Sequence, residues 1–259
     1  MSGVRIERST KILEIVIDRP PANAIDAQTS RDLGAAFVEL RDDSALRVGI
    51  IRAAGEKFFS AGWDLKAAAT KVRDDDWGPG GFAGLTELFD LRKPVIAAVN
   101  GLTVGGGFEL ALACDMIVAA ERSEFFLPEV NLGIVADAGG AIRLPRRLPH
   151  AIAMEMLLTG RRLSSKEALQ YGLVNYVVPA EGVLELARSL ANRICEAAPL
   201  AVAACMEVLD VSQGRSVEEA FRAMRAEGRE AYRRMRASAD AKEGSRAFAE
   251  KRAPKWAGY

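Results

Sequence analysis

Short apolar runs bounded by turn residues recur through the first half of the chain and predict β-strands. They lie at residues 12–18, 47–52, 95–99 and 116–119, and each has the length of a strand. The first run stops at Pro20-Pro21. A helix is predicted next, over residues 27–40, because Leu33 and Phe37 recur at helical spacing. Asp26 can cap its N-terminus. Strands that alternate with helices indicate an α/β fold with parallel strands.

From about residue 138 the chain has the periodicity of helices. Helices are predicted at residues 151–158, 164–171, 183–198, 200–211 and 217–237, with one strand at 174–178. Ser216 and Glu219 match a capping box at the start of the last helix. The pattern therefore predicts an α/β core over residues 1–198 and a C-terminal helical region over residues 199–259.

The segment 72–84 has no periodicity and predicts a surface loop. Three consecutive aspartates end at Asp76, and Trp77 and a glycine-rich stretch follow. A helix is expected after the loop, over residues 82–91. The glycines superficially fit a dinucleotide-binding pattern. No strand precedes them, however, and the acidic run would repel a pyrophosphate, so that interpretation is rejected.

The composition supports a packed core and argues against several classes of partner. Of the 259 residues, 49% are hydrophobic and 27% are charged, so disorder is not expected. Lys+Arg and Asp+Glu both number 35, and this neutral balance argues against nucleic acid or an anionic membrane as the main partner. Charged residues precede the first apolar run, and no run has the length of a membrane span. Neither a signal peptide nor a transmembrane helix is predicted.

Cysteine and histidine usage narrows the chemistry further. Cys114, Cys195 and Cys205 share no metal-ligand spacing, and an odd number of scattered cysteines predicts reduced thiols in a cytoplasmic protein. His150 is the only histidine, which argues against a histidine-based triad and a histidine-rich metal site. A surface or cap position is expected for it, since it follows Pro149 at the start of a helical stretch. No metal site is predicted.

A glycine-rich turn precedes the first candidate catalytic carboxylate, Glu109. The run 95–99 leads to Gly105-Gly-Gly-Phe-Glu109, in which a helix is predicted to begin near Gly106. Successive glycines let backbone N–H groups point outward from a helix N-terminus, where the dipole favours negative charge. Glu109 then lies one turn inside the helix. The alternative is a close helix–sheet crossing that needs glycine and leaves Glu109 exposed, and both interpretations stay open.

A second turn lies upstream, in Phe59-Ser-Ala-Gly-Trp-Asp64. Gly62 permits unusual dihedral angles, so that the N–H of Trp63 can face a ligand. Asp64 could cap a following helix. The alternative is an ordinary turn without a ligand.

The second candidate carboxylate is Glu129, which follows Pro128 and is expected at a helix start or a rigid turn. Apolar neighbours such as Val130 would partly desolvate it, and desolvation raises a carboxylate pKa toward the range useful for proton transfer. Asp137 lies eight residues later. It is either a third carboxylate of the site or the cap of a helix from residue 138 onward.

Together these segments resemble the crotonase superfamily, also called the enoyl-CoA hydratase/isomerase family. The matching segments are Phe59-Ser-Ala-Gly-Trp-Asp-Leu65, Lys93-Pro-Val-Ile-Ala-Ala-Val-Asn-Gly101, Gly105-Gly-Gly-Phe-Glu-Leu-Ala111, Cys114-Asp115, Pro128-Glu129, Leu132-Gly-Ile134, Gly139-Gly140 and Phe248-Ala-Glu-Lys-Arg252. They follow the family's order over nearly the whole chain. The resemblance implies an α/β fold with a repeated ββα spiral core and a C-terminal helical domain.

The resemblance also implies roles for particular residues. The N–H groups of Trp63 and Gly106 would form an oxyanion hole for a thioester oxygen. Glu109 and Glu129 match the family's catalytic pair and would hold a water molecule between them. In hydratases the position of Glu129 exchanges the proton at the α-carbon, and that of Glu109 activates water at the β-carbon.

Coenzyme A enters as part of the substrate, and the resemblance implies no other cofactor. Its groove would be lined by Ala61, Gly62, Asp64, Leu65 and Lys66. Phe248 and Lys251 match residues that reach the coenzyme A of a neighbouring subunit. The family forms trimers, often paired into hexamers, so residues 199–259 are expected to be a trimerisation region.

Closer features resemble the branch of the family that acts on crotonobetainyl-CoA, whose acyl group carries a trimethylammonium. They are Ala22-Asn-Ala-Ile-Asp26, residues 55–67 and 78–86, and Asp137, where many plain hydratases carry glycine. Quaternary cations favour aromatic faces, so Trp77 and Phe82 are expected to line the acyl pocket, with Asp137 adding negative charge. For Trp77 the alternative is simple loop packing.

Three functions are therefore weighed. Water addition to, or removal from, an acyl-CoA is favoured because both Glu109 and Glu129 are retained. A general enoyl-CoA hydratase and an enoyl- or dienoyl-CoA isomerase are alternatives within the family. A non-catalytic relative that binds coenzyme A or RNA belongs to a different class, and the neutral charge argues against it.

Overall fold

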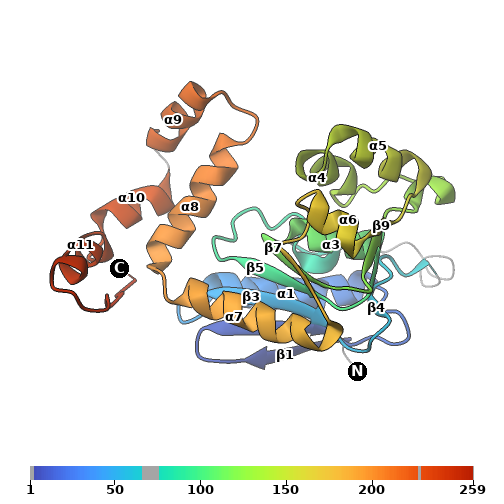
Figure 1. Cartoon of the computed structure of the whole chain (residues 1–259), viewed down its shortest axis with the longest axis horizontal. Helices are drawn as coiled ribbons and strands as arrows, with labels where there is room; N and C mark the ends of the chain where they lie inside the picture. Colours follow the sequence, from blue (N-terminus) through green and yellow to red (C-terminus); the bar gives the residue numbers. More distant parts are fainter. Residues whose placement is uncertain (1–2, 66–75, 227–228, 259) are drawn as a thin grey trace. The chain divides into compact units, whose positions relative to one another are not determined.

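The computed structural model describes residues 3–65, 76–226 and 229–258 (Figure 1). It divides into two compact units, Met1–Ala191 and Asn192–Tyr259, and each is described by itself. The first unit holds both sheets, and the second is helical. This is the mixed α/β fold with C-terminal helices that the sequence predicts. The trimerisation role of residues 199–259, and a boundary after residue 198, stay predictions.

A six-stranded sheet forms the centre of the first unit, in the order β1-β2-β3-β5-β7-β10. Its strands are β1 (Val4–Arg8), β2 (Ile12–Ile17), β3 (Val48–Ala53), β5 (Val95–Val99), β7 (Met116–Ala120) and β10 (Tyr176–Val178). Only the edge pair β1–β2 is antiparallel among the described pairs of this sheet. All residues of β2 and β5 are buried, as expected for parallel strands covered on both faces. The four strands predicted from the apolar runs are confirmed.

A second sheet has four short strands in the order β4-β6-β8-β9. They are β4 (Phe58–Ser60), β6 (Leu102–Val104), β8 (Glu124–Phe126) and β9 (Leu163–Ser164). The strands β4, β6 and β8 are parallel to one another, and β8 and β9 are antiparallel. Each of β4, β6 and β8 follows a long strand of the first sheet by a few residues, which is the repeated two-strand unit of the fold. The sequence did not predict these strands, because they have only two or three residues each.

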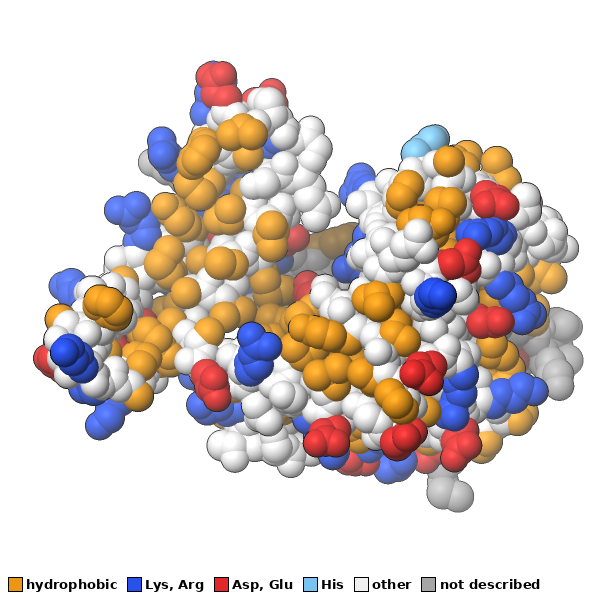
Figure 2. Space-filling model, in the orientation of Figure 1, with side chains coloured by type: hydrophobic (Ala, Val, Ile, Leu, Met, Phe, Trp, Pro, Cys, Tyr) orange, Lys and Arg blue, Asp and Glu red, His pale blue; other side chains and the backbone are white. Residues whose placement is uncertain are grey.

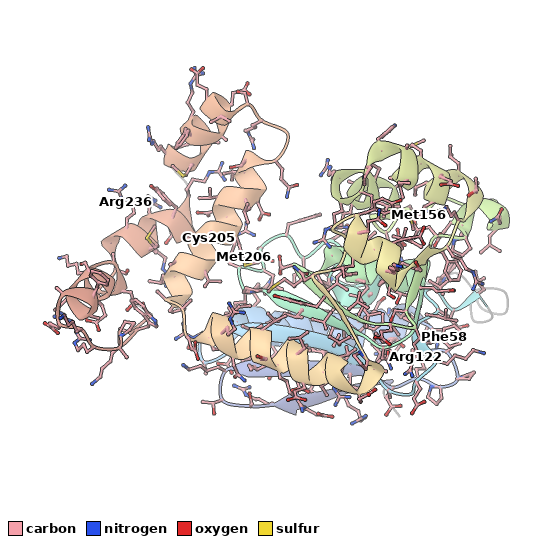
Figure 3. The ribbon with its side chains drawn as sticks, in the orientation of Figure 1. Phe58, Arg122, Met156, Cys205, Met206 and Arg236 are labelled. Carbon is pink, nitrogen blue, oxygen red and sulfur yellow. The ribbon has the colours of Figure 1, made fainter. Side chains whose placement is uncertain are left out.

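Helices complete the first unit. They are α1 (Ala27–Asp42), α3 (Gly106–Ala113), α4 (Gly140–Arg147), α5 (His150–Thr159), α6 (Ser165–Gln170) and the start of α7 (Val183–Cys195). Asp26 caps α1 as predicted, since its side chain accepts a hydrogen bond from the Thr29 amide. His150 is exposed at the first turn of α5, and Met156, on the same helix in Figure 3, is buried. Arg188 of α7 pairs with Glu14 of β2 at 2.6 Å.

The predicted helix over residues 82–91 is wrong. The segment forms one short 3₁₀ turn, η1 (Phe82–Gly84), and then irregular turns. Ala83 and Gly84 have φ angles of +55° and +69°, which a right-handed helix does not contain. A Cβ on Gly84 would collide with the backbone of Gly34 in α1. Glycine is therefore needed here for a close approach to α1, which explains the glycine-rich stretch without a nucleotide.

The second unit consists of α8 (Pro199–Ser212), α9 (Val217–Arg225), α10 (Glu230–Ala237), α11 (Asp240–Ala249) and the end of α7. The capping box of Ser216 and Glu219 is confirmed. The single helix predicted over residues 217–237 is wrong, because α9 ends at Arg225 and α10 begins at Glu230. Hydrophobic side chains lie on the surface of these helices (Figure 2), with Leu209, Val217 and Phe221 exposed. No helix in the described ranges is both long and apolar enough to cross a membrane.

Candidate active site

Three turns meet where the neighbouring parallel strands β4, β6 and β8 end. The turn after β4 contains Gly62, the turn after β6 contains Gly105, and Pro128 and Glu129 follow β8. Because the carboxyl ends of neighbouring parallel strands lie at the same edge of a sheet, segments that are 24 to 67 residues apart in sequence are brought together. The fold thus brings together the three turns that the sequence motifs predicted to carry the site.

The turn after β4 lies directly against the N-terminus of α3. Gly62 has a φ angle of +79°, and a Cβ there would lie 2.6 Å from the Gly106 nitrogen and 2.7 Å from the Val104 oxygen. Only glycine permits both the dihedral angle and this approach. The turn is therefore fitted to the second glycine segment, and a ligand at the Trp63 amide stays a prediction.

The amides of Trp63 and Gly106 are candidates for the oxyanion hole. Gly105 caps α3 with a φ angle of +52°, and Gly106 is the first helical residue, as predicted. A helix N-terminus leaves its first N–H groups without intrahelical partners. In the described part of the chain, neither the Trp63 amide nor the Gly106 amide donates to a backbone carbonyl. Both donors are therefore available to a ligand at the junction of the two turns.

Buried polar contacts hold the turn after β4 in place. Ser60 is fully buried, and its hydroxyl donates to the Asn23 carbonyl at 2.7 Å and accepts from the Gly62 amide at 3.0 Å. The side chain of Asn23 donates to the Ala54 and Phe58 carbonyls. These two residues fix the direction of the Trp63 amide. The sequence motifs did not indicate this role for Ser60 or Asn23, because the segments that these residues connect are more than 30 residues apart.

Glu109 lies one turn inside α3 and points into the protein. Its side chain is only 3% exposed, so the interpretation that left it exposed is wrong. The Gly140 amide, at the N-terminus of α4, donates to Glu109 Oε1 at 2.8 Å. A Cβ on Gly140 would lie 3.0 Å from the same oxygen, so glycine leaves room for the carboxylate.

Glu129 is the first residue of the 3₁₀ turn η2 (Glu129–Leu132), directly after Pro128, as predicted. Its Oε1 lies 2.6 Å from where a Cβ on Gly105 would stand, so this carboxylate is packed against the N-cap of α3. Its Oε2 is buried and has no hydrogen-bond partner among the described residues. Such an oxygen retains an acceptor for a ligand. Glu129 thus lies at the start of α3, the helix that carries Glu109.

The pKa of both carboxyl groups is raised above the ordinary value for glutamate. Burial is the main cause, and it raises the pKa of Glu109 to about 7. The negative charges of Glu129 and Asp137 raise the pKa of Glu109 further, while the Gly140 amide and Arg143 oppose the shift. Burial also raises the pKa of Glu129, and the charge of Asp137 adds to this. A carboxyl group with a pKa of about 7, such as Glu109, can exchange protons near neutral pH.

Asp137 is exposed and does not cap a helix. The helix α4 begins at Gly140, its N-cap is Gly139, and no side chain caps it. The capping alternative is therefore wrong, because Asp137 lies two residues too early. Its charge acts on both Glu109 and Glu129, which places it near the pair.

Two aromatic residues stand beside the glycine turn. The ring of Phe82 occupies the space that a Cβ on Gly106 would need. Trp77 packs edge-on against Phe82, with ring centroids 5.3 Å apart. Phe82 therefore borders the candidate oxyanion hole. Trp77 contacts Phe82, and the two side chains form an aromatic wall beside this site.

The remaining predicted residues are only partly placed. Ala61 and Gly62 lie in the turn itself, and Leu65 is 47% exposed next to it. Asp64 pairs with Arg19 at 2.7 Å. Lys66 lies outside the described residues. In the second unit, Phe248 is 87% exposed, and Lys251 has a φ angle of +52°. Contact of these residues with coenzyme A stays a prediction.

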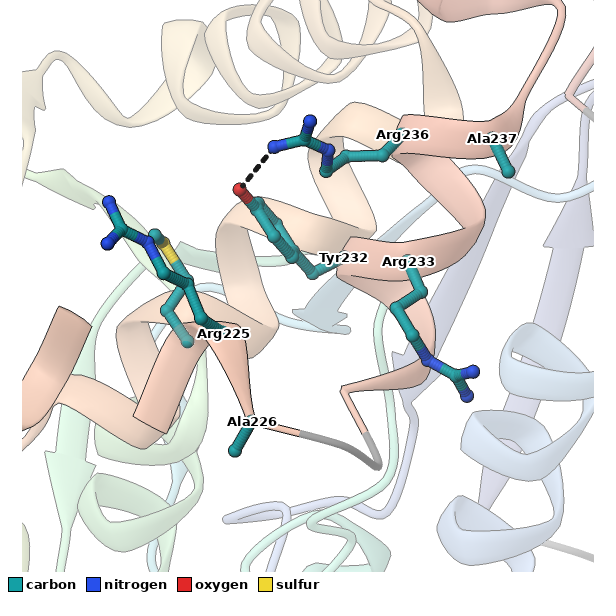
Figure 4. Close-up of a pocket in the computed structure, with 7 residues that line it drawn as sticks. Arg225, Ala226, Tyr232, Arg233, Arg236 and Ala237 are labelled. Carbon is teal, nitrogen blue, oxygen red and sulfur yellow. Dashed lines mark hydrogen bonds between the residues drawn. The ribbon is translucent and has the colours of Figure 1, made fainter. Parts of the chain in front are cut away.

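The second unit contains a hollow of about 450 Å³ between α9 and α10 (Figure 4). Arg225, Tyr232, Arg233 and Arg236 are among its lining residues. Arg236 donates to the Tyr232 hydroxyl at 3.4 Å, and Arg233 pairs with Glu230 at 2.8 Å. None of the predicted site residues lines this hollow. The glycine turns of the first unit, where the acid/base pair lies, are therefore the better candidate active site.

The cysteines take no part in this site. Cys114 is buried, Cys195 is half-buried, and Cys205, labelled on α8 in Figure 3, is exposed; none of the three forms a disulfide. Burial raises the pKa of the Cys114 thiol well above its ordinary value, so this thiol is not a nucleophile.

Comparison with known proteins agrees with this arrangement. Residues 7–259 match the family described as enoyl-CoA hydratase/isomerase. The chain belongs to this family, which confirms the family and the enzyme class predicted from the motifs.

Particular relatives narrow the comparison. The carnitinyl-CoA dehydratase of Salmonella arizonae is 57% identical over 258 residues, which are 99% of each chain. The carnitinyl-CoA dehydratase of Proteus mirabilis is 57% identical over 248 residues, which are 95% of each chain. Among solved structures, an enoyl-CoA hydratase from Mycobacterium tuberculosis superimposes with a TM-score of 0.91, at 42% identity and with both chains fully covered.

Proposed function

We propose that this protein is a hydratase/dehydratase that interconverts crotonobetainyl-CoA and carnitinyl-CoA. The observation that carries the reaction type is the pair of buried Glu109 and half-buried Glu129, both with a raised pKa, beside the amides of two glycine turns. Relatives at 57% identity that bear the name carnitinyl-CoA dehydratase support the choice of acyl group.

In the proposed mechanism the thioester oxygen binds to the amides of Trp63 and Gly106. These donors polarise the conjugated carbonyl and make the β-carbon electrophilic. Attack of water places negative charge on the thioester oxygen as an enolate, and the two amides stabilise this charge. Each such donor contributes about 3 kcal/mol in enzymes of this type.

The two carboxyl groups divide the proton transfers. Ionised Glu109 takes a proton from water as the hydroxyl adds to the β-carbon, and protonated Glu129 gives its proton to the α-carbon. The Gly140 amide favours the ionised form of Glu109, whereas Glu129 Oε2 has no donor among the described residues. The assignment of Glu109 as base and Glu129 as acid in hydration follows the family, because burial raises the pKa of Glu109 to about 7 despite the Gly140 amide. Dehydration reverses both transfers.

Recognition of the acyl group is proposed for the wall of Trp77 and Phe82, together with Asp137. A trimethylammonium is attracted to aromatic faces by about 0.5–2 kcal/mol each, and to a carboxylate by its charge. The contact of Trp77 with Phe82, which lies over Gly106, supports this placement. The effect of the Asp137 charge on the pKa of Glu109 and Glu129 supports its inclusion in this proposal.

The remaining parts of the proposal follow from the family. We propose that Ala61, Gly62, Asp64, Leu65 and Lys66 line the coenzyme A groove, and that Phe248 and Lys251 contact coenzyme A bound to a neighbouring subunit of a trimer or hexamer. The addition needs no metal or redox cofactor, because the amides stabilise the only charge that develops. We also propose a cytoplasmic location, for which the free thiols are support.

An activity panel tests the proposal. Purified protein is supplied with crotonobetainyl-CoA, crotonyl-CoA and longer enoyl-CoA substrates in ¹⁸O-labelled water. We expect loss of the enoyl absorbance, label at the β-carbon and the highest kcat/KM for crotonobetainyl-CoA. The variants E109Q and E129Q should each lose about 10²–10⁴-fold in kcat.

The outcomes separate the alternatives. A preference for crotonyl-CoA would favour a general enoyl-CoA hydratase, which the fit to the mycobacterial enoyl-CoA hydratase supports as the second candidate. Double-bond migration without incorporation of solvent oxygen would contradict hydration and indicate an isomerase.

A further inference from the structure

We propose that Arg143 is a positioning residue of this active site, which ties the Phe82–Thr86 turn to α4 and presents a positive charge to Glu109. This inference rests on the proposed function, because it concerns the base of the hydration step. It gives a role to a residue that lies outside all the motifs named above.

The first observation is a direct tie between Arg143 and the aromatic wall. Arg143 Nη2 donates to the Thr86 carbonyl at 2.6 Å. Thr86 is buried, and its hydroxyl donates to the Phe82 carbonyl at 2.9 Å. The ring of Phe82 in turn covers Gly106. Arg143 is thus connected through two hydrogen bonds to the residue that borders the candidate oxyanion hole.

The second observation is the position of Arg143 at the helix end that holds Glu109. Arg143 lies one turn into α4, and its guanidinium folds back over Gly139, where a Cβ would collide with it. The next residue, Gly140, donates its amide to Glu109 Oε1 at 2.8 Å. The guanidinium of Arg143 thus lies over the residue next to the amide that binds Glu109.

The third observation is the balance of charge around Glu109. The charged groups that face it are Glu129 and Asp137, which are negative, and Arg143, which is positive. Among the described residues Arg143 forms no direct ion pair with a carboxylate. A guanidinium stays protonated even when burial and neighbouring arginines lower its pKa. Its charge therefore opposes the burial that raises the pKa of Glu109 to about 7.

The balance of charge around Glu109 affects the hydration step. Hydration requires ionised Glu109, and with a pKa of about 7 this group is only partly ionised at neutral pH. Removal of the positive charge would raise the pKa of Glu109 further and deplete the base. Arg143 therefore extends activity to lower pH, and its tie to Thr86 holds the aromatic wall at the same time.

Three variants separate the charge from the packing. R143M removes both the charge and the hydrogen bond to Thr86. R143K keeps the charge but lacks the guanidinium group that donates to the Thr86 carbonyl. R147M is the matched control, because Arg147 lies on the same helix, is also half-buried and also donates to a backbone carbonyl, that of Cys114 at 2.6 Å. Arg147 is not among the charged groups that face Glu109.

We expect R143M to move the acid limb of the kcat/KM profile for crotonobetainyl-CoA upward by about 0.5–1 pH unit. R143K should keep the limb near its wild-type position while it raises KM or lowers kcat at all pH values. R147M should leave the limb unchanged. A loss by one constant factor across the pH range in R143M, or an equal shift in R147M, would overturn the proposal.

A second measurement does not depend on turnover. The pKa of the Glu109 carboxyl is read by infrared difference spectroscopy of wild type against E109Q, and then in the R143M background. The signal should titrate at higher pH without Arg143, and an unchanged titration would refute the inference. If wild type hydrates none of the enoyl-CoA substrates, the proposed function fails, whereas this titration still tests the contact of Arg143 with Glu109.

Discussion

Burial acts on Glu109 and Glu129 through the same physical effect but leaves them with different partners. Glu109 receives an amide hydrogen bond and faces one guanidinium, while Glu129 keeps a buried oxygen without a donor in the described chain. A carboxylate in a low-dielectric site holds its proton more tightly unless donors or cations compensate. These differences lead to two predictions for substitutions of single residues.

The first prediction concerns stability and pH. Glu109 binds a proton more tightly in the folded protein than in the unfolded chain, since its pKa rises from 4.5 to about 7. The associated stabilisation is fully present below about pH 4.5 and is lost as the pH rises through about 7, which amounts to about 3 kcal/mol. E109Q should therefore be more stable than wild type at pH 8, by up to that amount.

Chemical unfolding of both proteins at pH 5 and pH 8 measures this difference. Replacement of the exposed Glu56 by glutamine removes one negative charge elsewhere and serves as the control. An advantage of E109Q that is the same at both pH values would contradict the argument.

The second prediction concerns Asp137. D137N removes a negative charge near the acyl pocket, so kcat/KM for crotonobetainyl-CoA should fall about 10-fold, as for the loss of one charge interaction at a partly exposed site. Turnover of crotonyl-CoA, which carries no cation, should change little. Because Asp137 also raises the pKa of Glu109, the acid limb should move to lower pH in D137N. Equal losses on both substrates would remove the role of Asp137 in selectivity.

Glycines decide how the elements meet. The end of β4 and the turn after it pack against the start of α3 because Gly62 and Gly107 carry no side chain, and η1 packs against α1 because Gly84 carries none. In each case a side chain at the glycine would collide with the backbone of another element, so the residue must be glycine. Substitutions at these positions should act on the geometry of the site.

G62A tests this at the level of the element. The added methyl group would stand 2.6 Å from the Gly106 nitrogen, so it should displace one oxyanion donor and lower kcat about 10²-fold. Gly55 is the matched control, since its φ angle is +80° and nothing lies within 4 Å of a Cβ there. G55A should cost about 1 kcal/mol of stability and leave kcat unchanged. A similar kcat in G62A and G55A would contradict the proposed role of the turn.

At the scale of the whole molecule, the C-terminal unit presents Phe248 on its surface. This side chain is 87% exposed, although α11 is held firmly: buried Glu243 pairs with Arg246 and Arg252, and Asp240 accepts from two amides of the C-terminal tail. The ring is therefore accessible to a ligand. This agrees with the proposed contact with coenzyme A on a neighbouring subunit.

F248A should raise KM for crotonobetainyl-CoA about 10-fold without loss of stability, because the ring is exposed in the single chain. The corresponding pantetheine thioester lacks the nucleotide, so its KM should not change. A mixture of E109Q and F248A subunits should regain low-KM turnover, since sites with Glu109 would then receive Phe248 from the other variant. Failure of the mixture to lower KM would contradict a contact between subunits.

Local pattern was sufficient for much of the fold. The buried strands β2, β3, β5 and β7 and the cap of α1 at Asp26 follow from apolar runs and capping chemistry. The strands β4, β6 and β8 could not be predicted in this way, because two or three residues carry no detectable periodicity. The break between α9 and α10 could not be predicted either, because the helical spacing of hydrophobic residues continues across it.

The sequence by itself determined the family and the residue types of the site, because glycine turns and carboxylates at fixed spacing are local features that the chain carries in any conformation. Only the tertiary structure decided that Glu109 is buried, that Asp137 does not cap a helix, and that Arg143 donates to the Thr86 carbonyl. Burial and electrostatic contact depend on which distant segments become neighbours. The parallel arrangement of β4, β6 and β8 creates those neighbours, and no single segment of the chain encodes it.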